Sequence, residues 1–333
     1  MPDRCEVSTE EVRFHNGDIT LVGDLYLPAT AGIHPAVVCV HGSGPQSRKD
    51  IWGYAGAAER FATQGISTLV YDKRGVGDST GNWQEADFFA LAEDGLAGLR
   101  LLQGRDDINS RQIGVLGGSQ GGWIGPLMAA RSDDVAFVIS FSGPGVTPHE
   151  QNLYSFRNWL PEAGIAEEEW PSFVDSYVRL NSTARHYLTT GEDWEDAERE
   201  FVGYLIRQGV LSPEEVEAWS EQGGDSESVL RPYMQKMISE LDYDPVPALE
   251  GVTCPMLAIW GGKDIVVPVE KSVAVFGEAL KRAGNKDYTL KVFPNLDHGL
   301  QPPPAERRSD EEFDTRFLET IAEWILERVD IAS

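Results

Sequence analysis

The chain has 333 residues, of which 54 are acidic and 28 are basic, and this gives a formal charge of −26 at pH 7. So large a negative excess argues against general binding to nucleic acid or to anionic membranes, because both select basic surfaces. With 41% hydrophobic and 10% aromatic residues, the chain can bury a sizeable core, which argues against intrinsic disorder.

Eight short segments rich in apolar and β-branched residues predict strands. The first two alternate in polarity and are joined by Gly17-Asp18, which indicates an antiparallel hairpin. Three later segments are almost continuously apolar, as expected of strands that are covered on both faces. In chain order, the predicted strands are 11–16, 20–27, 36–40, 67–71, 112–116, 135–141, 256–260 and 288–293.

Apolar residues recur at spacings of three and four between the later strands, and this pattern predicts amphipathic helices. An antiparallel hairpin followed by alternating strands and helices predicts an α/β fold with a mostly parallel sheet. The predicted helices are 55–64, 88–102, 120–130, 271–282 and 311–328.

The segment from 147 to 249 breaks this alternation, since it is helical in character and has no convincing strand pattern. Residues 151–250 hold 21 acidic and 7 basic side chains, a net charge of −14. A block of this size between two core strands is typical of an inserted cap, and surface helices that stay away from the site are the alternative. We expect 1–146 and 250–333 to form one discontinuous core and 147–249 to form a helical cap.

The strongest local motif is Gly117-Gly118-Ser119-Gln120-Gly121, which fits the pattern G-x-S-x-G. A predicted strand leads into it and a predicted helix follows, so the serine would sit on a tight and strained turn. An ordinary glycine-rich turn is the plain alternative, but it requires neither flanking element. The context therefore predicts Ser119 as a nucleophile.

A serine nucleophile needs a base and a carboxylate that orients the base. His298 follows the last predicted strand, where its ring can reach back to the serine. Asp264 follows the strand 256–260, at the edge where open α/β sheets place their sites. Asp297 is the rival acid, but the direct neighbour of a histidine usually points elsewhere. The order Ser119, Asp264, His298 is the order of α/β-hydrolase triads.

An oxyanion hole needs two N–H donors that point at the developing negative charge. The N–H of Gln120, directly after the nucleophile, is the first expected donor. The second should come from the glycine-rich segment 41–45, with Ser43 as the first choice and Gly44 as the second.

Five further residues are candidates for contact with a substrate. His41, Gly42 and Gly44 lie in the same glycine-rich segment, and Tyr154 and Trp159 lie in the predicted cap. His41 could pass for a base, but its place before a glycine-rich turn favours a structural hydrogen bond. The cap aromatics could equally pack in a core of the cap itself.

Together these motifs resemble the α/β-hydrolase superfamily over nearly the whole chain, in the style of bacterial esterases of the dienelactone-hydrolase and prolyl-oligopeptidase-like groups. The resemblance implies an eight-stranded, mostly parallel sheet with helices on both faces and a cap inserted after the sixth strand. It also implies a structural role for the turn at 72–79. A serine in place of an aspartate nucleophile argues against dehalogenase or epoxide hydrolase chemistry. The resemblance rests on His41-Gly42-Ser43-Gly44, Asp72-Lys73-Arg74-Gly75-Val76-Gly77-Asp78-Ser79, the Ser119 turn and the loops of Asp264 and His298.

These residues predict a serine hydrolase that cleaves a carboxylic ester through an acyl-enzyme. An aminopeptidase or acylpeptide-type amidase and a carbon–carbon bond hydrolase would use the same residues and stay open as alternatives. A non-catalytic binding protein of the same fold is a further alternative, although such proteins often lack part of the triad. The acidic cap favours neutral or cationic esters over polyanionic ones.

The expected partner is a small-molecule substrate, with no nucleic acid and no membrane, and a homodimer stays open. Three cysteines without a CxxC pair suggest neither a disulfide framework nor a zinc site, so no metal or other cofactor is expected. The first residues lack the apolar stretch of a signal peptide, and no apolar run is long enough to span a bilayer. We therefore expect a cytoplasmic protein.

Overall fold

The computed structural model describes residues 7–50, 54–162, 164, 166–207, 212, 226–303 and 316–329. The chain divides into two compact units, one made of Met1–Val146 with Asp244–Ser333 and the other of Thr147–Tyr243. Helix α9 (Val246–Glu250), which falls almost entirely within the predicted cap block, belongs to the first unit because it packs against helices α3 and α10.

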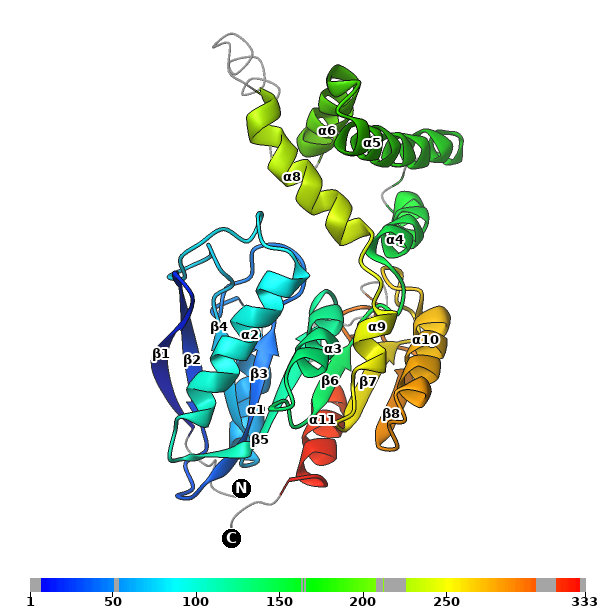
Figure 1. Ribbon diagram of the computed structural model, residues 1–333. Coiled ribbons are helices and arrows are strands. Elements are labelled where there is room, and N and C mark those ends of the chain that lie inside the picture. Colours follow the sequence, from blue (N-terminus) through cyan, green and yellow to red (C-terminus); the bar gives the residue numbers. More distant parts are fainter. Residues whose placement is uncertain are drawn as a thin grey trace. The chain divides into compact units, whose positions relative to one another are not determined.

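The first unit is built on one eight-stranded sheet, in the order β1-β2-β4-β3-β5-β6-β7-β8 (Figure 1). Strand β2 pairs antiparallel with β1 and β4, and the remaining neighbours pair in parallel. The prediction of a mostly parallel sheet with an antiparallel start is confirmed. The strands are β1 (Ser8–Asn16), β2 (Ile19–Leu27), β3 (His34–Val40), β4 (Ser67–Tyr71), β5 (Ile108–Gly118), β6 (Val138–Phe141), β7 (Met256–Gly261) and β8 (Tyr288–Phe293).

Helices cover both faces of this sheet, as predicted. Val37 and Cys39 of β3 belong to a buried cluster with α1 (Ala55–Thr63) and α11 (Arg316–Leu326). The equally buried Val38 and Val40 alternate to the opposite face, because successive side chains of a strand point in opposite directions. Helices α2 (Phe88–Gln103) and α3 (Gly121–Arg131) pack there against β3 and β5, and α10 (Val269–Arg282) packs against β8.

The start of one helix follows directly from the sequence. Helix α2 begins after Asp87, whose carboxylate accepts a hydrogen bond of 2.8 Å from the N–H of Ala90 and so caps the first turn. The last predicted helix, 311–328, is observed as α11 over Arg316–Leu326. Its predicted residues 311–315 lie outside the described part of the chain.

The second unit is helical and has a core of its own. Leu180, Tyr187, Phe201 and Met234 are buried in one cluster that joins α5, α6 and α8. Across the described residues of both units, no helix combines the length and the apolar character that crossing a bilayer requires. The helical elements of this unit are α4 (Pro148–Glu162), η1 (Glu167–Glu169), α5 (Trp170–Thr190), α6 (Trp194–Arg207) and α8 (Ser226–Leu241).

Candidate active site

Ser119 lies on the turn between the end of β5 at Gly118 and the start of α3 at Gly121. Its φ of 52° falls in the left-handed region, which is costly for a residue with a Cβ atom. The turn is so tight that a Cβ on Gly117 would lie 2.0 Å from the carbonyl oxygen of Gly121. A Cβ on Gly121 would lie 2.4 Å from the carbonyl oxygen of Val40. The flanking glycines of the motif are therefore required by close backbone packing.

The structure brings the other two residues of the expected triad to this turn. Nε2 of His298 lies 3.1 Å from Oγ of Ser119, and Nδ1 lies 2.7 Å from Oδ2 of Asp264. The carboxylate accepts the Nδ1–H proton, which leaves Nε2 to accept the proton of the serine hydroxyl. Oδ1 of the buried Asp264 accepts hydrogen bonds of 2.7 and 2.9 Å from the N–H groups of Val266 and Val267. These bonds fix the carboxylate against the ring.

Asp297, the rival acid, shapes the loop that carries the histidine. Its Oδ1 accepts hydrogen bonds from the N–H groups of Gly299 and Gln301, at 2.9 and 3.1 Å. Ser142, which the sequence reasoning missed, donates its hydroxyl to the carbonyl oxygen of His298 at 2.7 Å. It directly follows β6 at the carboxyl edge of the sheet, and this position was the signal that could have identified it.

Two backbone N–H groups are free to bind an oxyanion. Within the described part of the chain, neither the N–H of Ser43 nor that of Gln120 donates to a protein acceptor. Gln120 precedes the first turn of α3, where the helix dipole also favours negative charge. Ser43 and Ser119 line the same cavity. Both expected donors therefore belong to segments that meet at the serine.

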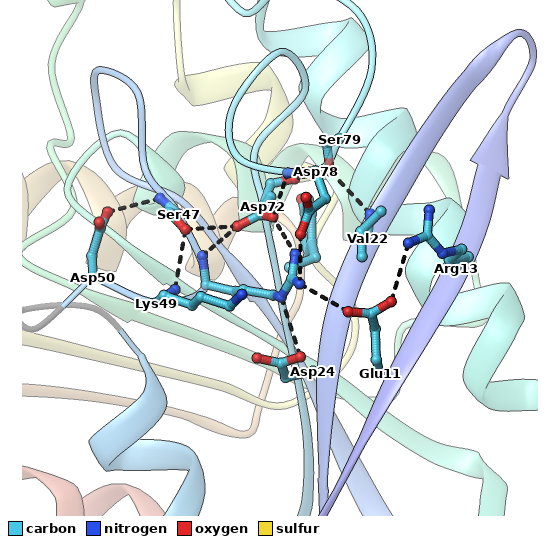
Figure 2. Close-up of polar contacts among 12 residues, drawn as sticks. Glu11, Arg13, Val22, Asp24, Ser47, Lys49, Asp50, Asp72, Asp78 and Ser79 are labelled. Atoms are coloured by element: carbon cyan, nitrogen blue, oxygen red, sulfur yellow. Dashed lines mark hydrogen bonds and ion pairs between the residues drawn. The ribbon is translucent and has the colours of Figure 1, made fainter.

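The segment that carries Ser43 is anchored by an ionic network around the buried side chain of Arg48 (Figure 2). The buried guanidinium of Arg48 donates to Asp24 at 3.2 Å, to Glu11 at 3.1 Å, to Asp78 at 2.9 Å and also to Asp72. Burial raises the pKa of Asp72, but hydrogen bonds from the N–H groups of Asp78 and Arg48 outweigh it and hold this pKa below the ordinary value. The network ties the segment to β1, β2 and the turn after β4.

His41 is not among the described residues that line the cavity, and its contacts agree with the favoured structural role. The ring is buried, and its Nε2–H donates to the carbonyl oxygen of Tyr71 at 2.5 Å. Burial, together with the nearby Lys73 ammonium, lowers the pKa of His41 to about 3. The neutral ring thus connects the segment 41–45 to β4 through a hydrogen bond.

This pKa makes a specific contribution to acid sensitivity. Between pH 7 and 5 the unfolded chain protonates His41, with an ordinary pKa of about 6.5, whereas the folded chain does not. The unfolded state therefore binds more protons, and the free energy of unfolding falls by about 2 kcal/mol over this range from this group alone. We expect the unfolding free energy of His41→Gln to fall less on acidification than that of the wild type, as measured by urea denaturation at both pH values. The exposed His15→Gln serves as the control, and equal pH dependence in all three proteins would contradict the assignment.

A cavity of about 680 Å³ opens beside Ser119 in the first unit. Gly42 and Ser43 belong to its lining, whereas Gly44 is not among the described lining residues. The carbonyl oxygen of Gly44 instead accepts a hydrogen bond from Nζ of Lys73. Tyr154 and Trp159 lie on α4 in the second unit, outside the described lining, so their substrate contact stays a prediction. The described lining is Gly42, Ser43, Gln46, Tyr54, Gly56, Ala57, Arg60, Leu116, Gly118, Ser119, Phe141, His298, Gly299, Phe317, Leu318 and Ile321.

Residues 37–313 match a sequence family described as "Alpha/beta hydrolase family". The chain belongs to the alpha/beta hydrolase family. The match confirms the resemblance that the motifs indicated. This α/β hydrolase is a hydrolytic enzyme, as predicted.

Two curated proteins and one solved structure are similar to this α/β hydrolase. Esterase EstD of Thermotoga maritima is 25% identical over 327 residues, which cover 94% of this chain and 68% of EstD. Monoacylglycerol lipase of Mycolicibacterium smegmatis is 24% identical over 313 residues, which cover 93% and 94% of the two chains. A solved structure of an esterase from Pyrococcus furiosus superposes with a TM-score of 0.61 at 16% identity, over 96% of this chain and 91% of that one. The last comparison shows the shared fold.

Proposed function

We propose that this α/β hydrolase cleaves carboxylic esters through an acyl-enzyme formed on Ser119. The observation that carries the proposal is the chain of contacts from Ser119 through His298 to Asp264, at 3.1 and 2.7 Å, beside a cavity in the same unit. The names of two curated relatives, an esterase and a monoacylglycerol lipase, support the ester class.

The proposed reaction uses each group in a stated role. Oγ of Ser119 attacks the ester carbonyl while Nε2 of His298 takes the hydroxyl proton, and Asp264 stabilises the imidazolium that forms. The N–H groups of Ser43 and Gln120 bind the oxyanion of the tetrahedral intermediate. His298 then protonates the leaving alkoxide, so the C–O bond breaks and the acyl-enzyme remains. Water, deprotonated by His298, attacks the acyl carbon, and His298 returns this proton to Oγ of Ser119 as the carboxylic acid leaves.

The lining of the cavity supports an apolar acyl group. Tyr54, Leu116 and Phe141 lie near the serine turn, and Phe317, Leu318 and Ile321 of α11 extend the apolar wall. A cavity with mostly apolar walls and few polar groups is typical of sites that bind small organic ligands.

One charged group in this lining bears on the substrate. Arg60 is the one permanently charged side chain among the described lining residues, and no described carboxylate pairs with its guanidinium. This position opposes the preference for neutral or cationic esters over polyanionic ones that the acidic cap suggested. We expect p-nitrophenyl hemiesters of dicarboxylic acids to be turned over better than esters with an ammonium at the same place. Arg60→Glu should reverse the order of kcat/KM, by about tenfold in each direction.

The surface variant Arg100→Glu is the matched control, because Arg100 is exposed as Arg60 is but lies on α2, outside the described lining. If the ratio of kcat/KM for hemiesters and ammonium esters shifts equally in both variants, the shift reflects net charge alone. That result would contradict a contact between Arg60 and the substrate.

A panel of esters, thioesters, amides and β-diketones with acyl groups of increasing length tests the reaction class, with a fluorophosphonate probe to label the nucleophile. Ester turnover with labelling of Ser119 supports the proposal. Faster cleavage of amides would favour an amidase, and cleavage of diketones without ester turnover would favour a carbon–carbon bond hydrolase. A folded protein that neither reacts with the probe nor turns over any substrate would point to a binding protein.

A further inference from the structure

Lys73 is a buried cation that the reaction scheme does not use. It follows Asp72 in the turn after β4 and is 2% exposed. Its Nζ donates to the carbonyl oxygens of Gly42 and Gly44, at 2.9 and 3.1 Å, and to Oε1 of Gln120 at 3.0 Å. These acceptors lie in the two segments that carry the expected oxyanion donors. One ammonium group therefore connects both halves of the oxyanion hole.

The bond to Gly42 acts directly on the donor of the next residue. The carbonyl of Gly42 and the N–H of Ser43 belong to one planar trans peptide unit, so they point in opposite directions. An ammonium held at 2.9 Å from this carbonyl oxygen therefore turns the Ser43 N–H away from Lys73. It also polarises the peptide, because hydrogen bonds made in sequence strengthen one another.

This segment needs such a restraint. Gly42 and Gly44 flank Ser43, and glycine, which has no Cβ atom, gives little resistance to rotation of the neighbouring peptides; Gly44 adopts a φ of 80°. The backbone of Lys73 restrains it once more, since its N–H donates to the carbonyl oxygen of Gln46 at 3.1 Å, and Gln46 in turn accepts the N–H of Gly42 through Oε1 at 2.8 Å.

The second half of the hole is the turn before α3. The Gln120 side chain makes no capping hydrogen bond to the helix, and its Oε1 accepts from Lys73 instead. The backbone of Lys73 is held in turn by its neighbour Asp72, which accepts hydrogen bonds from Ser47 and Arg48 (Figure 2). The backbone of Lys73 is thus held in place by hydrogen bonds of its neighbour, while its ammonium contacts two separate segments.

We propose that Lys73 is a positioning residue that aligns the N–H groups of Ser43 and Gln120 for the oxyanion. This inference rests on the proposed ester hydrolysis. Aligned donors stabilise the transition state, where charge develops on the carbonyl oxygen, much more than the ground-state complex. Loss of the ammonium should therefore lower kcat far more than it raises KM.

The test compares Lys73→Met with the wild type on an ester that the wild type hydrolyses. Removing one oxyanion donor costs about 10² to 10³ in kcat, so a misaligned hole should cost about 10- to 100-fold, with KM changed by less than about threefold. A trifluoromethyl ketone, whose adduct with serine carries the same oxyanion, should lose affinity by a similar factor. A purely structural lysine would not produce this parallel loss.

Arg74→Met is the matched control, because Arg74 is the next residue and its mostly buried guanidinium pairs with Asp94 and the carbonyl of Ala90, away from the serine. It should lower the Tm but leave kcat and inhibitor affinity within about twofold. If Lys73→Met does not fold, Gln120→Ala removes one acceptor, keeps the backbone donor and should lower kcat by about three- to tenfold.

The two proposals fail in different ways. A wild type that hydrolyses no ester overturns the proposed function. An active wild type whose Lys73→Met variant keeps kcat and trifluoromethyl ketone affinity within about twofold overturns the role of Lys73. That role is also overturned if Arg74→Met lowers both quantities as much as Lys73→Met does.

Discussion

Ser119→Ala should lower kcat on an activated ester such as a p-nitrophenyl ester by about 10⁶-fold, the loss typical of removing a triad nucleophile. The serine hydroxyl is the atom from which the acyl-enzyme forms, and no other hydroxyl takes its place at Nε2 of His298 in the described site. The variant should keep its fold, because this is the only hydrogen bond of the Ser119 side chain among the described residues. Steady-state turnover, burst kinetics and fluorophosphonate labelling measure the loss.

Ser119→Gly is the informative companion. It should be as inactive as the alanine variant, yet more stable than wild type by about 1 kcal/mol, because glycine adopts the φ of 52° without the Cβ clash. Alanine retains that clash and should show no such gain in Tm. Turnover near the wild-type rate in a folded Ser119 variant would exclude this serine as the nucleophile.

Asp264→Asn is expected to lower kcat by about 10⁴-fold while leaving the architecture of the site intact. The asparagine amide would donate toward Nδ1 of His298, which favours the tautomer that carries its proton on Nε2. Nε2 could then no longer accept the proton of Ser119. The pH-rate profile of the residual activity and the hydrolysis rate of a p-nitrophenyl ester would report the change.

Asp297→Asn is the matched control, because Asp297 is the neighbour of the histidine and its Oδ1 accepts from the backbone of the same loop. An asparagine side-chain oxygen can accept the same two bonds, so kcat should fall by less than about tenfold. If Asp297→Asn caused the large loss and Asp264→Asn did not, the orienting acid would be Asp297.

The parts of the site that could be predicted are those set by local chain geometry. A strand, a glycine-rich turn and a helix place Ser119, and strand ends place Asp264 and His298, because parallel strands present their carboxyl ends at one edge. The strand and helix pattern of the first unit follows from the periodicity of apolar residues in the same way.

The parts that could not be predicted depend on contacts between distant segments. Lys73 lies in a turn that the family resemblance marks as structural, and its sequence neighbours give no sign that its ammonium reaches Gln120. Ser142 contacts a residue 156 positions later in the chain. The cavity wall joins α1 and α11, and only the folded core brings these helices together. The structural role of His41 depends on the hydrogen bond that its buried ring donates to Tyr71, and the local sequence does not show this contact.

The insertion of the second unit between β6 and β7 also has a consequence for folding kinetics. These strands are neighbours in the sheet, with Val138 opposite Met256, so their pairing must close a loop that contains the whole helical unit. Loop-closure entropy and slow non-local pairing both disfavour this step in an unfolded loop. Within the unit, however, the first helix α4 contacts the last helix α8. Early folding of the unit would bring its two ends close together, shorten the effective loop and speed completion of the sheet that holds Asp264 and His298.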